Sequence, residues 1–171
     1  MRTILLLSIL SLGIGQITSN WEISPDYAVK FTAKKATGTF DKLQGNIQFD
    51  PANLTTAKFA VWVETATIST GNKTKDNHAR GNKWLDAEQF PRISFESSEF
   101  KQTTDGYEVE GMLNIHGVAK KVSIPFTFSD QVFAGSLIIN RKDFGIEGPF
   151  LFGGLVGDDI KISLKVPVTK K

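Results

Sequence analysis

The chain has 171 residues, with 20 Lys and Arg against 18 Asp and Glu, no cysteine and 40% hydrophobic residues. This length fits one domain, and the composition excludes a disordered chain. The even, dispersed charge excludes an electrostatic footprint for nucleic acid or for an anionic membrane surface. The lack of cysteine excludes disulfides, thiolate metal sites and a thiol nucleophile.

The first residues are typical of a targeting segment. A positively charged start and an apolar run over 4–12 precede Gly13-Ile14-Gly15, a small-residue cleavage pattern. The run is shorter than the roughly 20 residues that span a bilayer. We therefore expect a signal peptide over 1–15, cleaved at its end or after Ser19, and one exported domain over 16–171 without a stable membrane anchor. A buried N-terminal strand is the alternative.

The rest of the chain alternates apolar and polar residues with a period of two, which is the pattern of antiparallel strands with one covered face. Turn signals separate several of these segments, among them Asp105-Gly106 and His116-Gly117. In chain order, the alternating segments are 29–33, 43–49, 59–63, 93–95, 107–115, 122–128, 137–139 and 160–166.

Strands without intervening helices leave an antiparallel sandwich or a closed barrel. We favour an all-β barrel of about eight strands, because the apolar faces are long and rich in phenylalanine and because the first and last strands are regular enough to pair. One segment, about 72–90, breaks the alternation with many charged and few apolar residues, and it ends before Pro91. It predicts a short helical insert of one or two helices lying over the barrel.

No arrangement of side chains is typical of catalysis or metal binding. The two histidines, His78 and His116, stand in no metal-ligand spacing, and no nucleophile elbow, phosphate loop or dinucleotide fingerprint occurs. His78 and Asp76, two residues apart on a helix, would not share a face as an acid–base pair. We therefore expect no enzyme activity, no metal and no cofactor.

The apolar interior is the remaining candidate site. Side chains either fill a barrel of eight strands or leave room for one ligand, and the sequence leaves both open. Gly45, Gly111 and Gly135 place no side chain on a strand and favour a cavity. The candidate lining residues are Phe31, Phe49, Phe59, Val61, Val63, Phe95, Val109, Leu113, Ile115, Ile124, Phe126, Phe128, Leu137, Ile139, Phe144, Ile160 and Ile162.

Several short motifs follow one another along the chain after Trp21. They are Gly38–Phe40, Leu43–Pro51, Ile68–Gly71, Lys75–His78, Phe90–Ser97, Gly111–Val118, Arg141–Ile146 and Val156–Ile162. In this order and spacing they resemble the YceI-like family of exported bacterial lipid- and polyisoprenoid-binding proteins, whose fold is a lipocalin-like barrel. The chain departs from the family where Ser24–Ala28 replaces an Asp and a His-Ser pair, and where Ala79 replaces a Leu.

The resemblance implies a periplasmic or otherwise extracytoplasmic protein that holds a long-chain amphiphile for transport or storage. The ligand would be a polyisoprenoid, an isoprenoid quinone or a fatty acid derivative. The expected partner is this apolar small molecule and not nucleic acid, and a homodimer is left open. Arg141 and Asp143 are predicted to form a polar pair that contacts the head group or fixes the following bend. The alternative is an interaction or stress-response module with a filled barrel and no bound lipid.

Overall fold

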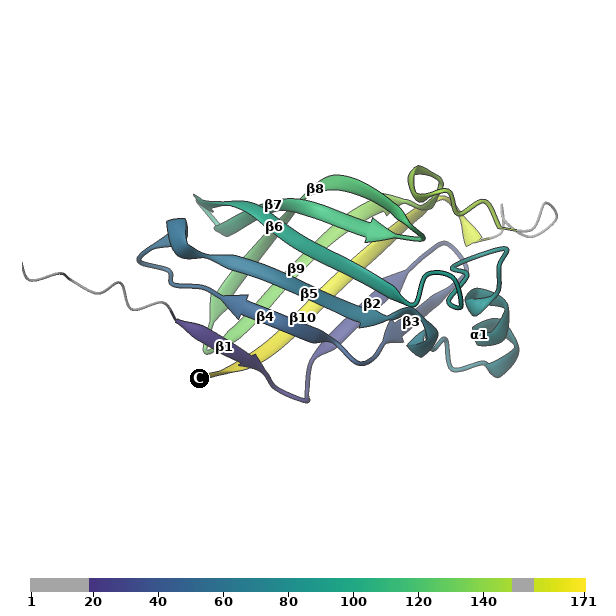
Figure 1. The fold of residues 1–171 in the computed structure, drawn as a ribbon, viewed down its shortest axis with the longest axis horizontal. Helices are drawn as coiled ribbons and strands as arrows, with labels where there is room; N and C mark the ends of the chain where they lie inside the picture. Colours follow the sequence, from purple (N-terminus) through teal and green to yellow (C-terminus); the bar gives the residue numbers. More distant parts are fainter. Residues whose placement is uncertain (1–18, 149–155) are drawn as a thin grey trace, which may run out of the picture.

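The computed structural model describes residues 19–148 and 156–171, and its strands form one closed antiparallel sheet (Figure 1). The predicted signal peptide lies outside the described residues. The strands are β1 (Asn20–Ile23), β2 (Ala28–Thr32), β3 (Thr37–Phe40), β4 (Gln44–Gln48), β5 (Lys58–Glu64), β6 (Arg92–Thr103), β7 (Gly106–Ile115), β8 (Val118–Ser129), β9 (Val132–Asn140) and β10 (Asp159–Lys170). Three short 3-10 helices are η1 (Leu54–Thr56), η2 (Thr65–Thr67) and η3 (Arg141–Phe144).

These strands occupy eight positions around a barrel. From β4 to β10 each strand pairs with the next in the chain, and β10 pairs on its other edge with β1 and with β2. The segments β1 and β2 lie end to end along β10, while β4 and β3 pair with β1 and β2 in the same way. The predicted barrel of about eight strands, closed by its first and last strands, is confirmed.

Turns interrupt the first two positions of the barrel. The chain turns at 24–27 between β1 and β2 and again at 41–43 between β3 and β4. At these breaks the Tyr27 hydroxyl accepts a hydrogen bond from the backbone N–H of Leu43, 3.0 Å away. A side chain therefore supplies the cross-strand partner that the interrupted ladder lacks.

Aromatic rings fill one end of the barrel. The side chain of Phe49 is fully buried, and the Trp21 indole N–H donates to its carbonyl oxygen at 2.8 Å. Six rings lie with their centroids 5.1 to 6.1 Å from the Phe49 ring, several of them edge-on, as aromatic pairs prefer. We call Phe49 and these six residues the aromatic plug; the six are Phe59, Phe100, Tyr107, Phe126, Phe128 and Phe133.

A β-bulge supplies one ring of the plug. The pairing of β6 with β7 skips Ser98, since the residues on either side of it pair with consecutive residues of β7. Side chains of a strand alternate between its faces, so one extra residue reverses the alternation. Phe100 therefore joins the core with Phe95, although the two lie an odd number of positions apart in the sequence and would face opposite sides of a regular strand.

The hydrogen-bonded ladder between β8 and β9 covers only part of their length. These strands pair only from Phe126 with Gly135 to Ser129 with Val132. The ladder ends beside Pro125, which has no N–H to donate. Beyond this point the 3-10 helix η3 contacts both strands, and its Phe144 is buried in the core.

The helix α1 (Lys73–Arg80) lies at the other end of the barrel from the plug (Figure 1). Its buried Asp76 accepts hydrogen bonds from the Thr70 N–H at 2.7 Å and the Thr70 hydroxyl at 2.6 Å, which hold the pKa of the carboxyl below its ordinary value. Arg80 donates from Nε to the carbonyl oxygen of Ala66 at 2.7 Å. Both contacts fix α1 to the barrel, and turns form the rest of the predicted insert.

Arg141 ties the loops at this end together. The residue is 4% exposed, and its guanidinium donates to the carbonyl oxygens of Glu147, at 2.6 Å, and Gly157, at 2.9 Å. It also pairs with the carboxylate of Asp158 at 2.8 Å. The guanidinium thus reaches across the loop to a carboxylate just before β10, and the predicted polar pair of Arg141 with Asp143 stays a prediction.

We expect truncation at the centre of the plug to cost most stability. Phe49→Ala should lower the free energy of unfolding by about 3–5 kcal/mol, because the lost ring leaves a cavity among packed neighbours. Phe40→Ala is the control, since this half-buried ring packs against Phe31 outside the plug and should cost less. Urea unfolding followed by circular dichroism measures both, and equal losses would contradict the central role of the plug.

The contribution of Asp158 to stability should depend on pH. A hydrogen bond from Lys142, with the charges of Lys142 and Arg141, holds the pKa of Asp158 below its ordinary value of 3.8. Such a group stabilises the fold above its unfolded pKa and loses this contribution as the pH falls through its folded pKa. The wild type should therefore exceed Asp158→Asn in stability at about pH 6, and the difference should shrink toward about pH 3. Urea midpoints at both pH values test this, and a constant difference would contradict it.

Candidate functional site

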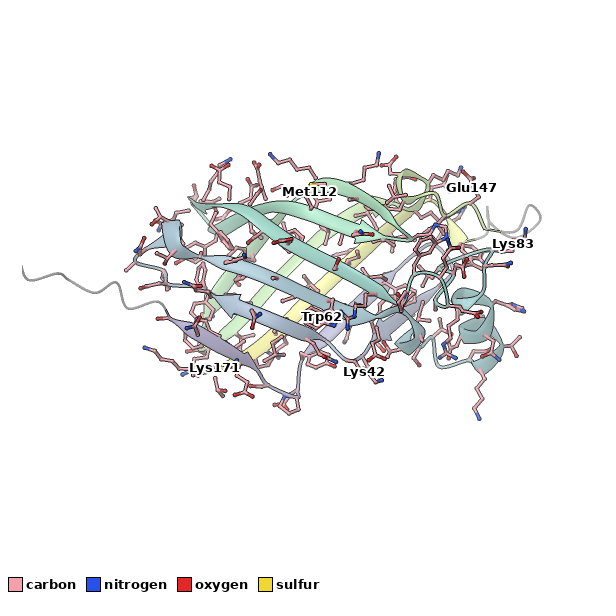
Figure 2. All side chains as sticks on the ribbon, viewed as in Figure 1. Lys42, Trp62, Lys83, Met112, Glu147 and Lys171 are labelled. Atoms are coloured by element: carbon pink, nitrogen blue, oxygen red, sulfur yellow. The ribbon has the colours of Figure 1, made fainter. Side chains whose placement is uncertain are left out.

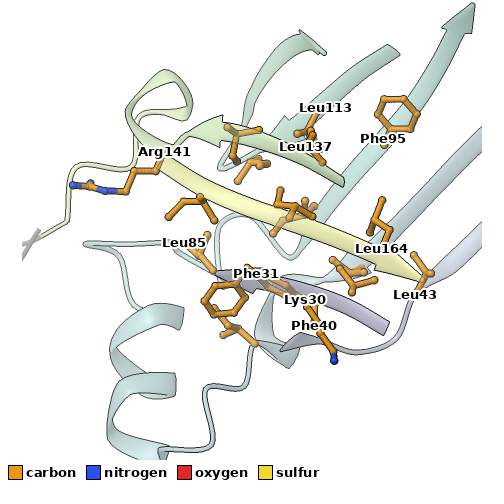
Figure 3. A pocket seen from close by; sticks show the side chains of 18 of the residues that line it. Lys30, Phe31, Phe40, Leu43, Leu85, Phe95, Leu113, Leu137, Arg141 and Leu164 are labelled. Atoms are coloured by element: carbon orange, nitrogen blue, oxygen red, sulfur yellow. The ribbon is translucent and has the colours of Figure 1, made fainter. Parts of the chain in front are cut away.

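Above the aromatic plug the barrel is hollow. The cavity has a volume of about 1020 Å³, at the upper end of the roughly 300–1,000 Å³ common for small-molecule sites. Strands β2 to β10 all contribute to its lining, which is almost entirely apolar (Figure 3). The sequence left open whether the barrel is filled or hollow. Both hold at different depths along its axis, since rings fill one end and a cavity occupies the other.

Most of the predicted lining residues face this cavity. Phe49 and Phe128 belong to the plug instead, and Phe144 closes the wall where β8 and β9 part. That any lining residue binds a ligand stays a prediction. The predicted residues that line the cavity are Phe31, Phe59, Val61, Val63, Phe95, Val109, Leu113, Ile115, Ile124, Phe126, Leu137, Ile139, Ile160 and Ile162.

Of the three glycines predicted to favour a cavity, Gly135 lines it, but Gly45 and Gly111 do not create this space. A Cβ on Gly111 would lie 2.6 Å from the Phe95 ring, and one on Gly45 would lie 2.1 Å from the Ala60 carbonyl oxygen. Both positions let a neighbouring strand or ring approach closely, so they are occupied rather than empty. The cavity is hollow because shorter aliphatic side chains, such as Val61 and Ile139, face the axis where the plug has rings.

Sequence reasoning missed several lining residues. Phe133 of β9 lines the cavity at the edge of the plug, and the alternation from Leu137 through Gly135 to Phe133 could have found it. Trp84 and Leu85 line the mouth from the segment after α1. They are adjacent apolar residues in an otherwise polar segment, and this pattern could have predicted that they cover an apolar surface.

Although Lys30 of β2 and Ser94 of β6 also belong to the lining, most polar lining residues lie where the cavity opens beside α1, at what we call the mouth. Its lining includes Lys35, Lys75, His78 and Lys83, while the described lining residues include no Asp or Glu. The Arg141 guanidinium lies 5.5 Å from the centroid of the Trp84 ring, close enough for a cation–π contact. The mouth is therefore a basic rim above an apolar space.

The described residues assemble little that could do chemistry. Asp76 is hydrogen-bonded to Thr70, and His78 is exposed at the mouth. Among residues 19–148 and 156–171, no three His, Asp or Glu side chains cluster as a metal site. In the same part of the chain, every buried side-chain nitrogen or oxygen has a hydrogen-bond partner. None of the helices described there is both long and apolar enough to cross a membrane.

Comparison with known proteins identifies the family. The YceI-like domain matches residues 21–168. A UPF0312 protein of Yersinia pestis (strain Pestoides F) is 30% identical over 136 residues, or 71% of each chain. Burkholderia cenocepacia BcnA matches in structure with a TM-score of 0.79 at 25% identity, over 86% of this chain and 99% of that chain. A Saccharophagus degradans domain, described as polyisoprenoid-binding and implicated in plant cell wall breakdown, matches with a TM-score of 0.65 at 12% identity, over 88% and 98%. The chain described here belongs to the YceI-like family.

Proposed function

We propose that this protein is a binding protein, not an enzyme, that holds the tail of a long-chain amphiphile in its barrel. The observation that carries the proposal is an apolar cavity of about 1020 Å³ that the aromatic plug closes at one end and that opens at the other. A tail in this cavity leaves water for an apolar lining, while its polar end stays at the mouth. The ligand classes are a polyisoprenoid, an isoprenoid quinone or a fatty acid derivative.

The energetics of burial favour long tails. Each buried methylene contributes about 0.8 kcal/mol, so a tail of about 16 carbons gains roughly 12 kcal/mol before costs. Association and ordering of the chain cost roughly 4–15 kcal/mol. A short acyl chain is then held weakly and a polyprenyl chain well, which suits a cavity that runs along the barrel from plug to mouth.

Three further observations support a carrier or store outside the cytoplasm. The described lining offers no carboxylate to act on a bound tail, which supports binding over catalysis. The Saccharophagus degradans domain described as polyisoprenoid-binding shares the fold. The apolar N-terminal run supports export to the periplasm or another extracytoplasmic compartment.

The expectations of no nucleic-acid partner and no stable membrane anchor stay predictions, as does a homodimer. The filled barrel of the alternative function does not match the cavity.

Protein purified from the organism that makes it should carry its ligand. We expect native mass spectrometry to show adduct masses that disappear after extraction with organic solvent. The extracted protein, refolded and measured again, is the control, and added lipid extract should restore the adducts. A bare mass in every preparation would contradict a carrier with a resident ligand.

A matched pair of substitutions tests whether the tail occupies the cavity. Ile139 lines the cavity, whereas its neighbour Ile138 on β9 is 70% exposed. Ile139→Glu should weaken binding of geranylgeraniol, a neutral isoprenoid alcohol, at least about tenfold, because a buried charge must be desolvated. Ile138→Glu should leave the Kd unchanged.

The variant Ile139→Trp provides a second test without a new charge, since its larger ring occupies the tail's volume. Ile138→Trp is its control, and circular dichroism confirms that each variant is folded. Displacement of a fluorescent fatty acid gives the Kd values. Unchanged binding by both folded Ile139 variants would place the tail elsewhere.

A further inference from the structure

Four lysines line the cavity: Lys30 lies on β2, and the other three come from separate segments at the mouth. Lys35 lies in the turn between β2 and β3, Lys75 lies on α1, and Lys83 follows α1. Figure 2 shows Lys83 at the same end of the molecule as α1, with Lys171 at the opposite end. The charge is dispersed along the sequence, so this basic rim exists only in the fold.

No carboxylate within the described chain neutralises these amines. The ion pairs among residues 19–148 and 156–171 use other cations, and no described lining residue is acidic. The acid on α1, Asp76, is buried against Thr70, and Glu147, at the same end of the molecule (Figure 2), is exposed but does not line the cavity. The described lining of the mouth therefore carries basic and no acidic side chains, a charge distribution that favours an anion.

Arg141 does not supply this function. Its guanidinium is buried and engaged by backbone carbonyl oxygens and by Asp158, so it serves the loops rather than a ligand. The lysines are exposed point charges on flexible stems, which can contact a phosphate or carboxylate without a fixed geometry. Exposed lysines alone make no site, but here the cavity below them fixes where the polar end of a bound molecule lies.

We propose that the mouth binds an anionic head group, so that the amphiphile held by this protein is a phosphate ester or a carboxylate and not a neutral alcohol or quinone. The inference rests on the proposed function, because the tail in the cavity presents the head group to Lys35, Lys75 and Lys83. A basic mouth distinguishes anionic from neutral amphiphiles, whereas the apolar lining contacts only the tail and cannot distinguish them.

Two ligands that differ in their head group test the inference. Geranylgeranyl phosphate and geranylgeraniol share one tail, so the ratio of their Kd values reports on the head group alone. The wild type should bind the phosphate at least about tenfold more tightly, and added salt should reduce the ratio, because it screens exposed charges. The triple variant Lys35→Gln/Lys75→Gln/Lys83→Gln should lose this preference and keep its Kd for the alcohol.

The control variant changes the net charge equally at sites away from the mouth. Lys58→Gln/Lys165→Gln/Lys170→Gln replaces three exposed lysines of β5 and β10 that are outside the lining and make no ion pair with the rest of the described chain. This variant should keep the wild-type preference for the phosphate. A parallel loss of preference in both triple variants would overturn the inference, since net charge and not the mouth would then be responsible.

The remaining outcomes separate the inference from the proposed function. Equal Kd values of the wild type for the two ligands, or an unchanged preference in the mouth variant, overturn the inference and leave the proposed function intact. Failure to bind either ligand overturns both. If the mouth variant keeps the preference but takes up ligand more slowly from vesicles containing phosphatidylglycerol, the lysines act on the membrane surface and the inference is wrong.

Discussion

The packing of Phe49 against six surrounding rings is the interaction on which the rest of the structure depends. A chain without cysteine has no disulfide to stabilise it, so its core must do so alone. An interior of eight strands is narrow enough for rings to fill completely, and here they fill one end. Their burial stabilises the whole closed sheet, because the plug takes rings from β5 to β9. Concentrating the aromatic core in this way lets the other end stay open, where apolar surface remains for a ligand to cover.

The polar interactions of the open end hold its shape. Asp76 and Arg80 fix α1 to the segment that follows β5, and Arg141 joins η3 to the loop before β10. Asp76 accepts from the N–H and hydroxyl of Thr70, and both arginines donate to backbone carbonyl oxygens, so these charges are satisfied within the fold. The sequence suggested Arg141 as a head-group contact or a structural residue, and its buried side chain makes the hydrogen bonds that a structural role requires. The groups left for a ligand are the exposed ones, above all the lysines.

Alternation of apolar residues predicted the barrel, its closure and most of the inward-facing side chains, because a period of two determines which face of a strand a residue occupies. It does not determine how deep along the barrel axis a side chain lies, so the sequence placed Phe49 and Phe128 inside without separating plug from cavity. The bulge at Ser98 reverses the alternation, so the sequence pattern did not identify Phe100 as an inward-facing residue. The wall beside Phe144 and the grouping of lysines at the mouth depend on contacts between distant segments, which no local pattern contains.

In the proposed function, specificity comes from the mouth, because an apolar tube selects a tail by length and bulk and distinguishes poorly among chains of similar size. The two departures from the family pattern differ in this respect. Tyr27 serves the backbone, since its hydroxyl accepts the hydrogen bond at the strand break. Ala79, in place of a Leu, lines the mouth on α1, where a smaller side chain leaves more room beside Lys75 and Lys83. In the proposed function, residues of this kind, rather than those of the plug or the apolar wall, determine which head group the mouth accepts.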